Sequence, residues 1–239
     1  MRAVVYTGML VPIDTVTLVN AFSSIGAVCR MIEIKHKETG AVLLRIEGDS
    51  FKGHKLDGAQ LAGAQLAGMD LTKTTMQNVN LARADLSGAR LDGADLQSAI
   101  LTETTFDRAS LITANLTDAV AQGASFRHAD LSGAQLRYAR LQNADLAGAN
   151  LRGADLSMAT LRANLNNANL SKSDLRGADL TGANLTGADL SEANMHEAKL
   201  RDANMLRAKL DGAIGPQGKA FGGPAKNKMK SQPWWKFWG

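Results

Sequence analysis

Between Leu56 and Leu210, a large apolar residue recurs at every fifth position, with a single break. Two positions before it the residue is Ala in most repeats, and the other three positions are mostly polar, charged or Gly. A period of five matches neither the periodicity of a helix nor the alternation of a simple strand. A coil with one flat side per five residues would place the large residue and the Ala inside at every repeat. The pattern therefore predicts one continuous solenoid over most of the chain.

The repeated unit is a five-residue word, A-(D/N)-L-x-x. Ala-Asp-Leu-Ser-Gly occurs at residues 84–88 and again at 129–133, and Ala-Asp-Leu-Thr-Gly at 178–182 runs directly into Ala-Asn-Leu-Thr-Gly at 183–187. We call the Leu position the centre of the word. Short polar residues suit the outward positions, because the corners of a coil are tight and such side chains hydrogen-bond the nearby backbone.

These words resemble those of the pentapeptide-repeat family, over residues 54–214. The resemblance implies an all-β fold, a right-handed quadrilateral β-helix with four words per coil. The 32 words of the chain then make about 8 coils, and at ~4.8 Å per coil the rod is expected to be roughly 38 Å long. One residue is missing between the centres Leu161 and Leu165, and we expect that corner to tighten so that the register recovers.

One centre departs from the rule. Ala121 stands where the word has Leu, so a cavity should lie between Leu101 and Leu141 unless Val120 turns inward. A Leu-to-Ala truncation in a core costs about 2–5 kcal/mol, so we expect local repacking. Val120 and Ile100 hold equivalent outward positions one coil apart. We expect them to stack as a small exposed apolar patch and regard both as candidate partner-binding residues.

The two flanks of the solenoid differ. Residues 31–53 contain two strand-like runs around a turn at 37–40, which predicts a β-hairpin that caps the N-terminal end of the coil. Three interpretations of residues 1–30 remain: an extra strand, a short helix, or a segment upstream of the true start of the protein, if the given start is mis-assigned. Residues 215–239 begin with a Gly- and Pro-rich stretch, which predicts a flexible, disordered tail.

The tail is basic and aromatic. It holds five Lys and no acidic residue, and all three Trp of the protein lie in its last six residues. Three roles stay open: the aromatics cap the coil, bind a protein partner, or touch a membrane surface or nucleic acid. The candidate partner-binding residues of the tail are Trp234, Trp235, Phe237 and Trp238.

The net charge of +4 is carried by this tail rather than by the coil. Residues 54–214 hold sixteen basic and eighteen acidic side chains, so the rod is not predicted to bind nucleic acid directly. Sorted by face, the most acidic side of the coil is net −3, and the side with Ile100 and Val120 is net +2. Neither side approaches the charge density of duplex DNA, about one charge per 1.7 Å.

No motif for catalysis, a cofactor or a metal stands out in the sequence. The four His share no metal-like spacing, no phosphate-binding loop is present, and a smooth rod offers no desolvated cleft for paired carboxylates. Cys29 is the only cysteine, which excludes a disulfide within the chain. We find neither a long apolar run nor a recognisable signal peptide and expect a cytoplasmic protein. We predict that it is not an enzyme.

The leading hypothesis is a non-catalytic protein-interaction scaffold, a rod that binds an unknown protein partner. Some pentapeptide-repeat proteins, such as the quinolone-resistance members, act on DNA gyrase by mimicking DNA. That resemblance supplies the alternative of a DNA-mimic modulator of gyrase or topoisomerase, which the modest acidity of the faces disfavours. A third alternative is a membrane-surface adaptor, with the Trp-rich tail as a weak interfacial contact.

Overall fold

Each word folds into a short extended segment followed by a tight turn. The computed structural model describes residues 30–221, and residues 84–88 show the plan: Ala84 is the inner residue, Asp85 the bridge residue, Leu86 the centre, and Ser87 and Gly88 the two corner residues. The N–H of the next inner residue donates to the carbonyl of Leu86 at 3.0 Å, which closes a β-turn. The second corner residue has a positive φ, 64° at Gly88, and this explains why Gly is frequent there.

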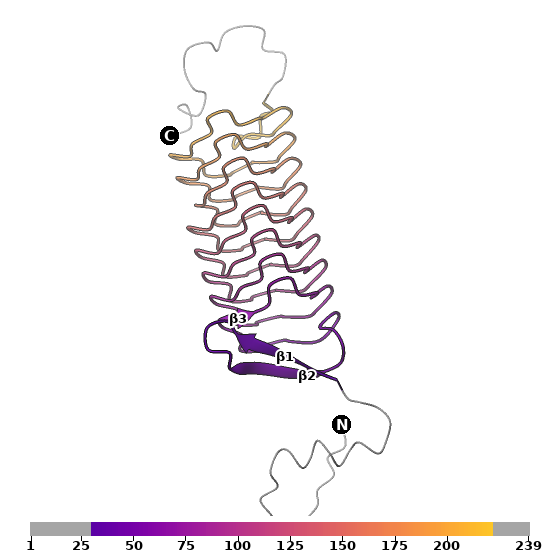
Figure 1. Cartoon of the computed structure of the whole chain (residues 1–239). Coiled ribbons are helices and arrows are strands. Elements are labelled where there is room, and N and C mark those ends of the chain that lie inside the picture. Colours follow the sequence, from indigo (N-terminus) through magenta and orange to yellow (C-terminus); the bar gives the residue numbers. More distant parts are fainter. Residues whose placement is uncertain (1–29, 222–239) are drawn as a thin grey trace, which may run out of the picture.

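The words form the right-handed quadrilateral β-helix that the family resemblance implies. Each bridge residue pairs in parallel with the equivalent residue of the next coil, as Asp85 does with Thr105. The pairs form four columns, one for each face, and the coils stack into a rod (Figure 1). We name the faces by their first and last bridge residues: face A runs from Lys55 to Ile214, face B from Gln60 to Lys199, face C from Gln65 to Asn204 and face D from Asp70 to Lys209.

The interior of the rod is a stack of centres and inner Ala residues. All centres from Leu56 to Met205 are buried. On face C the rings of Phe106 and Phe126 stack with their centroids 4.8 Å apart and their planes 2° from parallel. Because each coil contacts only its neighbours, stability should add up nearly independently along the axis.

Ala121 is accommodated without the inward turn of Val120 that we considered. Val120 stays in the outward bridge column of face B, between Ile100 and Arg140. Ala121 itself is buried. The next centre in the same coil is Phe126, which is larger than the usual Leu and is fully buried.

The missing residue near Leu161 tightens one corner, as expected. The N–H of Ala163 donates to the carbonyl of Leu161 at 2.8 Å, across one residue fewer than in the ordinary turn. Pairing across this coil joins Asp145 to Asn164, and the following pair, Asn164 to Asn184, has the usual spacing again. The columns of all four faces therefore continue through the short corner.

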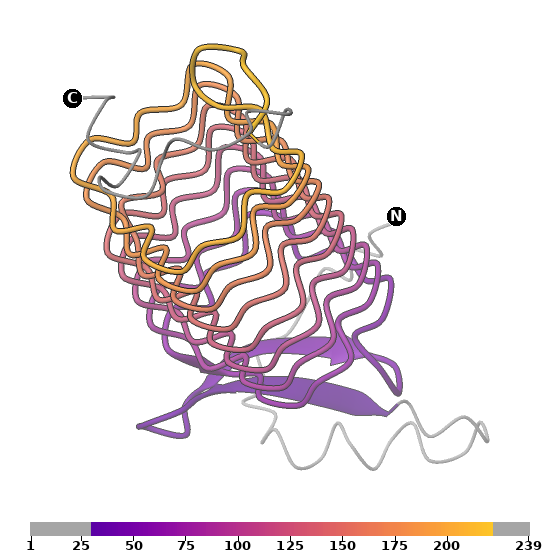
Figure 2. The ribbon, with the colours of Figure 1, turned by 90° about the horizontal axis from the view of Figure 1, so that it is seen from above.

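A three-stranded sheet covers the N-terminal end of the coil. Strands β1 (Met31–His36) and β2 (Val42–Glu47) form the predicted antiparallel hairpin, and β1 also pairs with β3 (Ala64–Gln65) of the first coil. Figure 2 shows the two long strands lying across this end of the rod. Ile34 is fully buried. Four further apolar side chains of the hairpin pack against the core: Ile32, Leu43, Leu44 and Ile46.

Residues 215–221, which we expected in a flexible tail, instead turn back over the last coil. The N–H of Gly215 donates to the carbonyl of Lys219 at 2.8 Å. The N–H of Phe221 donates to the carbonyl of Ala213 at 2.7 Å, and the Phe221 side chain packs against the core. The Gly and Pro residues of this stretch thus make a return turn, which has the same composition as a linker.

Candidate interaction surface

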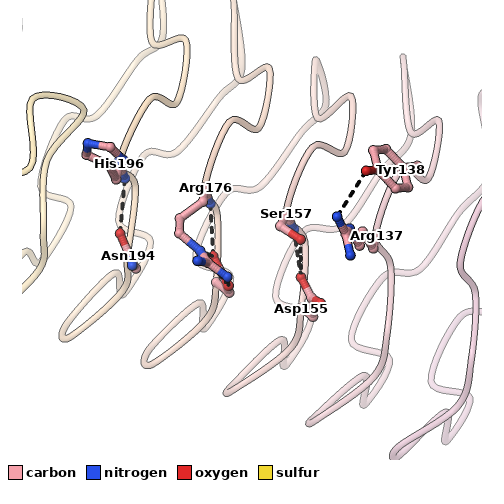
Figure 3. Close-up of polar contacts among 8 residues, drawn as sticks. Arg137, Tyr138, Asp155, Ser157, Arg176, Asn194 and His196 are labelled. Atoms are coloured by element: carbon pink, nitrogen blue, oxygen red, sulfur yellow. Dashed lines mark hydrogen bonds and ion pairs between the residues drawn. The ribbon is translucent and has the colours of Figure 1, made fainter.

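Asp or Asn at the bridge position has a structural task in this fold. Its side-chain oxygen accepts a hydrogen bond from the N–H of the first corner residue, two positions later, and so holds the turn. Figure 3 shows three such bonds on successive coils of face A: from Ser157 to Asp155 (2.9 Å), from Arg176 to Asp174 (3.0 Å) and from His196 to Asn194 (3.1 Å). Most acidic side chains at bridge positions therefore have a local structural reason to be there.

Face B lacks the hydrogen bond between a bridge Asp or Asn and the first corner N–H on four consecutive coils. Its bridge residues there are Ile100, Val120, Arg140 and Thr160, none of which is Asp or Asn. Within residues 30–221, no other face lacks Asp and Asn on more than two coils in succession. A run of positions that breaks a local stabilising rule marks a candidate functional surface.

Ile100 and Val120 lie at the start of this run. The structure places them as neighbours in the bridge column, as the repeat predicts. The Ile100 side chain is exposed, at 42%, and Val120 is half-buried. Their contact with a partner stays a prediction.

The apolar surface continues onto the corner between faces A and B. Tyr138 and Met158 hold second corner positions one coil apart and are 44% and 53% exposed. Met158 lies over Gly177 of the following coil, where a Cβ would clash with its sulfur. Ile100, Val120, Tyr138 and Met158 thus lie one on each of four consecutive coils, on face B and on its corner with face A, and we call these four residues the corner patch.

Arginine side chains border the corner patch. The guanidinium of Arg137 lies over the Tyr138 ring, 4.8 Å from its centroid, and its Nη2 donates to the Tyr138 hydroxyl at 3.0 Å (Figure 3). Arg140 follows Val120 in the bridge column and makes no side-chain hydrogen bond or ion pair with any described residue. Because Arg137 already orients the ring, a partner that binds Tyr138 loses less side-chain entropy.

Two carboxylates near the patch each form an ion pair with an arginine, Asp174 with Arg176 and Asp179 with Arg162. Burial raises the pKa of Asp174, but hydrogen bonds from Arg176 outweigh this effect and lower it. Burial also raises the pKa of Asp179, whereas hydrogen bonds from Arg162 and Thr181 lower it to about 2. Both carboxyl groups are therefore ionised at neutral pH, and both arginines are engaged within the coil.

The sequence pattern missed Tyr138 and Met158, although it carried a signal for them. Both are bulky residues at the second corner position, twenty residues apart, where Gly and polar residues are usual. Sorting residues by face hides a surface that crosses from a face to a corner. The other predicted contact residues, Trp234, Trp235, Phe237 and Trp238, lie outside the described residues.

Residues 30–221 offer neither a metal site nor a membrane-spanning helix. No group of three or more His, Cys, Asp and Glu side chains there could hold a metal ion. In the same range, no helix has the length and apolar character needed to cross a membrane.

The family described as Pentapeptide repeats matches residues 55–93, 89–127, 129–162, 162–196 and 178–214. The chain belongs to this family. None of the curated proteins compared with it matches.

Three solved structures show what the chain is similar to. One is HetL, a pentapeptide repeat protein involved in heterocyst differentiation regulation from the cyanobacterium Nostoc sp. strain PCC 7120, with 35% identity over 71% of this chain and 88% of that chain and a TM-score of 0.34. Another is trypsin-treated QnrB1, a plasmid-mediated fluoroquinolone resistance protein, with 23% identity over 66% of this chain and 91% of that chain and a TM-score of 0.43. The third is alr5209 from Nostoc PCC 7120, with 37% identity over 44% of this chain and 84% of that chain and a TM-score of 0.31.

Proposed function

We propose that the chain is a non-catalytic scaffold that binds a protein partner through the corner patch. The observation that carries this proposal is the loss of the Asp or Asn hydrogen bond on four consecutive coils of face B, at the place where apolar side chains are exposed. Tyr, Met and Arg are enriched in the cores of protein interfaces. A stacked coil also keeps such side chains at fixed spacing, which favours binding by lowering the cost of ordering them.

The corner patch is an anchor for a larger contact rather than a whole interface. Four coils at ~4.8 Å span roughly 15 Å from the first to the last, which is shorter than a standard interface. Polar groups for its rim come from Arg137 and Arg140, which flank Tyr138 in the sequence, and from Asp118, which holds the equivalent corner position one coil below. Binding would then depend strongly on Tyr138 and Met158 and weakly on the charged rim.

The test is a double substitution that removes the patch and suits the backbone. Tyr138 and Met158 both have φ near 61°, and Asn tolerates this left-handed conformation better than either residue does. Tyr138→Asn with Met158→Asn should therefore fold. The matched control is Lys73→Asn with Arg108→Asn, at two second corner positions with φ of 57°. We expect a protein partner captured by full-length chain and by the control to be lost with the patch variant.

The same experiment separates the alternatives. A partner set that the patch variant leaves unchanged contradicts the proposal. Recovery of gyrase subunits, followed by an effect in a supercoiling assay, would favour the gyrase modulator. A chain that ends at residue 222 keeps Phe221 and removes the tail aromatics. If only that truncation loses partners or flotation with liposomes, the contact residues are those of the tail.

A further inference from the structure

The last coil ends in an open strand edge on face B. Within the described residues, the N–H groups of Leu200 and Asp202 have no backbone acceptor and the carbonyl of Ala198 has no backbone donor. One coil earlier the equivalent groups are all bonded, each at 2.8 Å: Leu180 N–H to Lys199, Gly182 N–H to Arg201, and Lys199 N–H to Ala178. The last coil therefore offers the same two donors and one acceptor through which the coil before it holds the last coil.

The edge is open because the chain leaves the path of the coil. If the words continued, Lys219 would lie above Lys199 on face B, twenty residues further on. Instead the bond from Gly215 to Lys219 turns the chain back at face A. A hollow of about 640 Å³ lies beside this edge. Its lining includes Ala198, Lys199, Leu200, Arg201 and Pro216, together with Arg162 and Thr181 of the two coils below.

Three cationic side chains line the hollow, and only Arg162 among them forms an ion pair with a described residue, Asp179. The exposed side chains of Lys199 and Arg201 make no ion pair or hydrogen bond with any described residue. Elsewhere in the coil, an acidic bridge residue pairs with a basic bridge residue of the next coil. The Lys209 Nζ lies 3.8 Å from an Asp189 carboxylate oxygen in this way. Asp179, the bridge residue below Lys199, pairs with Arg162 instead, so an acidic residue above Lys199 would form such a pair in the reverse order.

We propose that this edge binds an extended, acidic segment of a partner protein, which adds to face B as a parallel strand. An acidic residue placed above Lys199 would donate its N–H to the carbonyl of Ala198 and accept a hydrogen bond from the N–H of Leu200. A small residue before it and a Leu after it would cover the apolar interior. The chain's own residues 222–239 contain four Lys and no acid, and like charges disfavour them as the occupant. This site goes beyond the corner patch, from which it is separate.

The probe is a fluorescent peptide with two acidic words of this coil, Ala-Asp-Leu-Ser-Gly-Ala-Asp-Leu. Its anisotropy is measured with full-length protein, and the comparison peptide carries Lys in place of both Asp. Lys199→Glu with Arg201→Glu reverses the charge of the edge, and Lys73→Glu with Arg108→Glu makes the same charge change far from it. We expect the edge variant to bind the acidic peptide at least about tenfold more weakly than wild type and to prefer the Lys peptide. The control variant should bind like wild type.

A second peptide tests strand addition separately from charge. Methylation of the backbone nitrogen of each Asp removes the N–H meant for Ala198, and we expect binding to weaken by about tenfold or more. Equal binding of the methylated peptide would reduce the site to a basic patch and overturn the proposal. Three other results would also overturn it: no binding of the acidic peptide to full-length protein, equal binding by both charge variants, or binding that appears only when residues 223–239 are removed.

Discussion

The two ends of this rod are finished in different ways. At the N-terminal end, a hairpin buries Ile34 and packs four more apolar side chains on the core, and β1 hydrogen-bonds to β3 of the first coil. At the C-terminal end, Phe221 alone of residues 215–221 packs on the core, and the strand edge of face B has no partner within the described chain. The face B centres of the first and last coils differ in the same direction: Leu61 is 0% exposed and Leu200 is 9% exposed.

A regular solenoid can therefore carry a function in two kinds of place. In the middle coils, the bridge, centre and second corner N–H groups bond the neighbouring coils, so side chains are the main groups left to contact a partner. An uncovered end offers backbone groups as well, and natural proteins usually protect such edges. The corner patch is a site of the first kind, and the edge beside Leu200 is a site of the second kind.

The largest expected effect distinguishes the two caps. Ile34→Ala should lower the free energy of unfolding by about 3 kcal/mol, because it truncates a fully buried side chain. Phe221→Ala should lower it by about 1–2 kcal/mol, because Phe221 is only partly buried. Urea unfolding of each variant measures both values. Equal losses would mean that the two ends are closed equally well.

A substitution in the middle of the rod tests the packing of the interior apart from either end. Ala121→Leu should destabilise the protein by about 1–3 kcal/mol if the larger Phe126 of the same coil takes up the space beside Ala121, because the added side chain would then overpack the interior. Adding Phe126→Leu should restore most of the loss, and a double-mutant cycle in urea measures the coupling. If Ala121→Leu alone stabilises the protein, the coil contains the cavity that the sequence pattern suggested.

The ion pair beneath the open edge should make part of the stability depend on pH. The pKa of Asp179 is about 2 in the folded protein, whereas an Asp without these partners has its ordinary pKa of 3.8. The group therefore binds its proton more weakly when folded, and its stabilisation is present above about pH 4 and lost as the pH falls towards 2. Asp179→Asn keeps an acceptor for Thr181. It should lower the free energy of unfolding by about 1 kcal/mol at neutral pH, a value reduced because solvent screens the exposed Arg162.

Urea unfolding between pH 2 and pH 7 checks this prediction. The Asn variant should differ from wild type at neutral pH and converge with it near pH 2. Asp202→Asn, at an exposed position without an ion pair, is the control and should leave the pH profile unchanged. A constant difference across the range would mean that the Arg162 contact is not electrostatic.

The smallest expected effect is a gain in stability that leaves both ends unchanged. Thr113 has a φ of 55°, which a β-branched side chain adopts only with strain. Thr113→Gly should raise the free energy of unfolding by about 0.5–1 kcal/mol. The relief of backbone strain in the folded protein should outweigh the greater conformational entropy that Gly gives the unfolded chain. Thermal unfolding measures the change. A lower melting temperature would show that the threonine side chain contributes more through its contacts than its backbone costs.

The five-residue period was enough to predict the coil and the recovery of register after Leu161, because burial of Leu and Ala repeats in nearly every word, whereas the four faces followed from the family resemblance. It also placed Ile100 and Val120 side by side. The pattern could not predict the return turn at residues 215–221, since Gly and Pro serve a linker and a tight turn alike. It also could not show Tyr138 and Met158 as part of one surface, because that surface crosses a corner and depends on how side chains lie over the next coil.

Amide hydrogen exchange in the full-length protein tests the contrast between the ends most directly. The Leu180 and Met195 amides donate to the following segment at 2.8 Å, and we predict that they exchange slowly. The Leu200 and Met205 amides have no acceptor within the described chain, and we predict exchange close to the rate of an unprotected amide. The acidic peptide should slow exchange at Leu200. Equal protection of all four amides in the protein alone would contradict the account, because it would mean that the C-terminal edge is already covered.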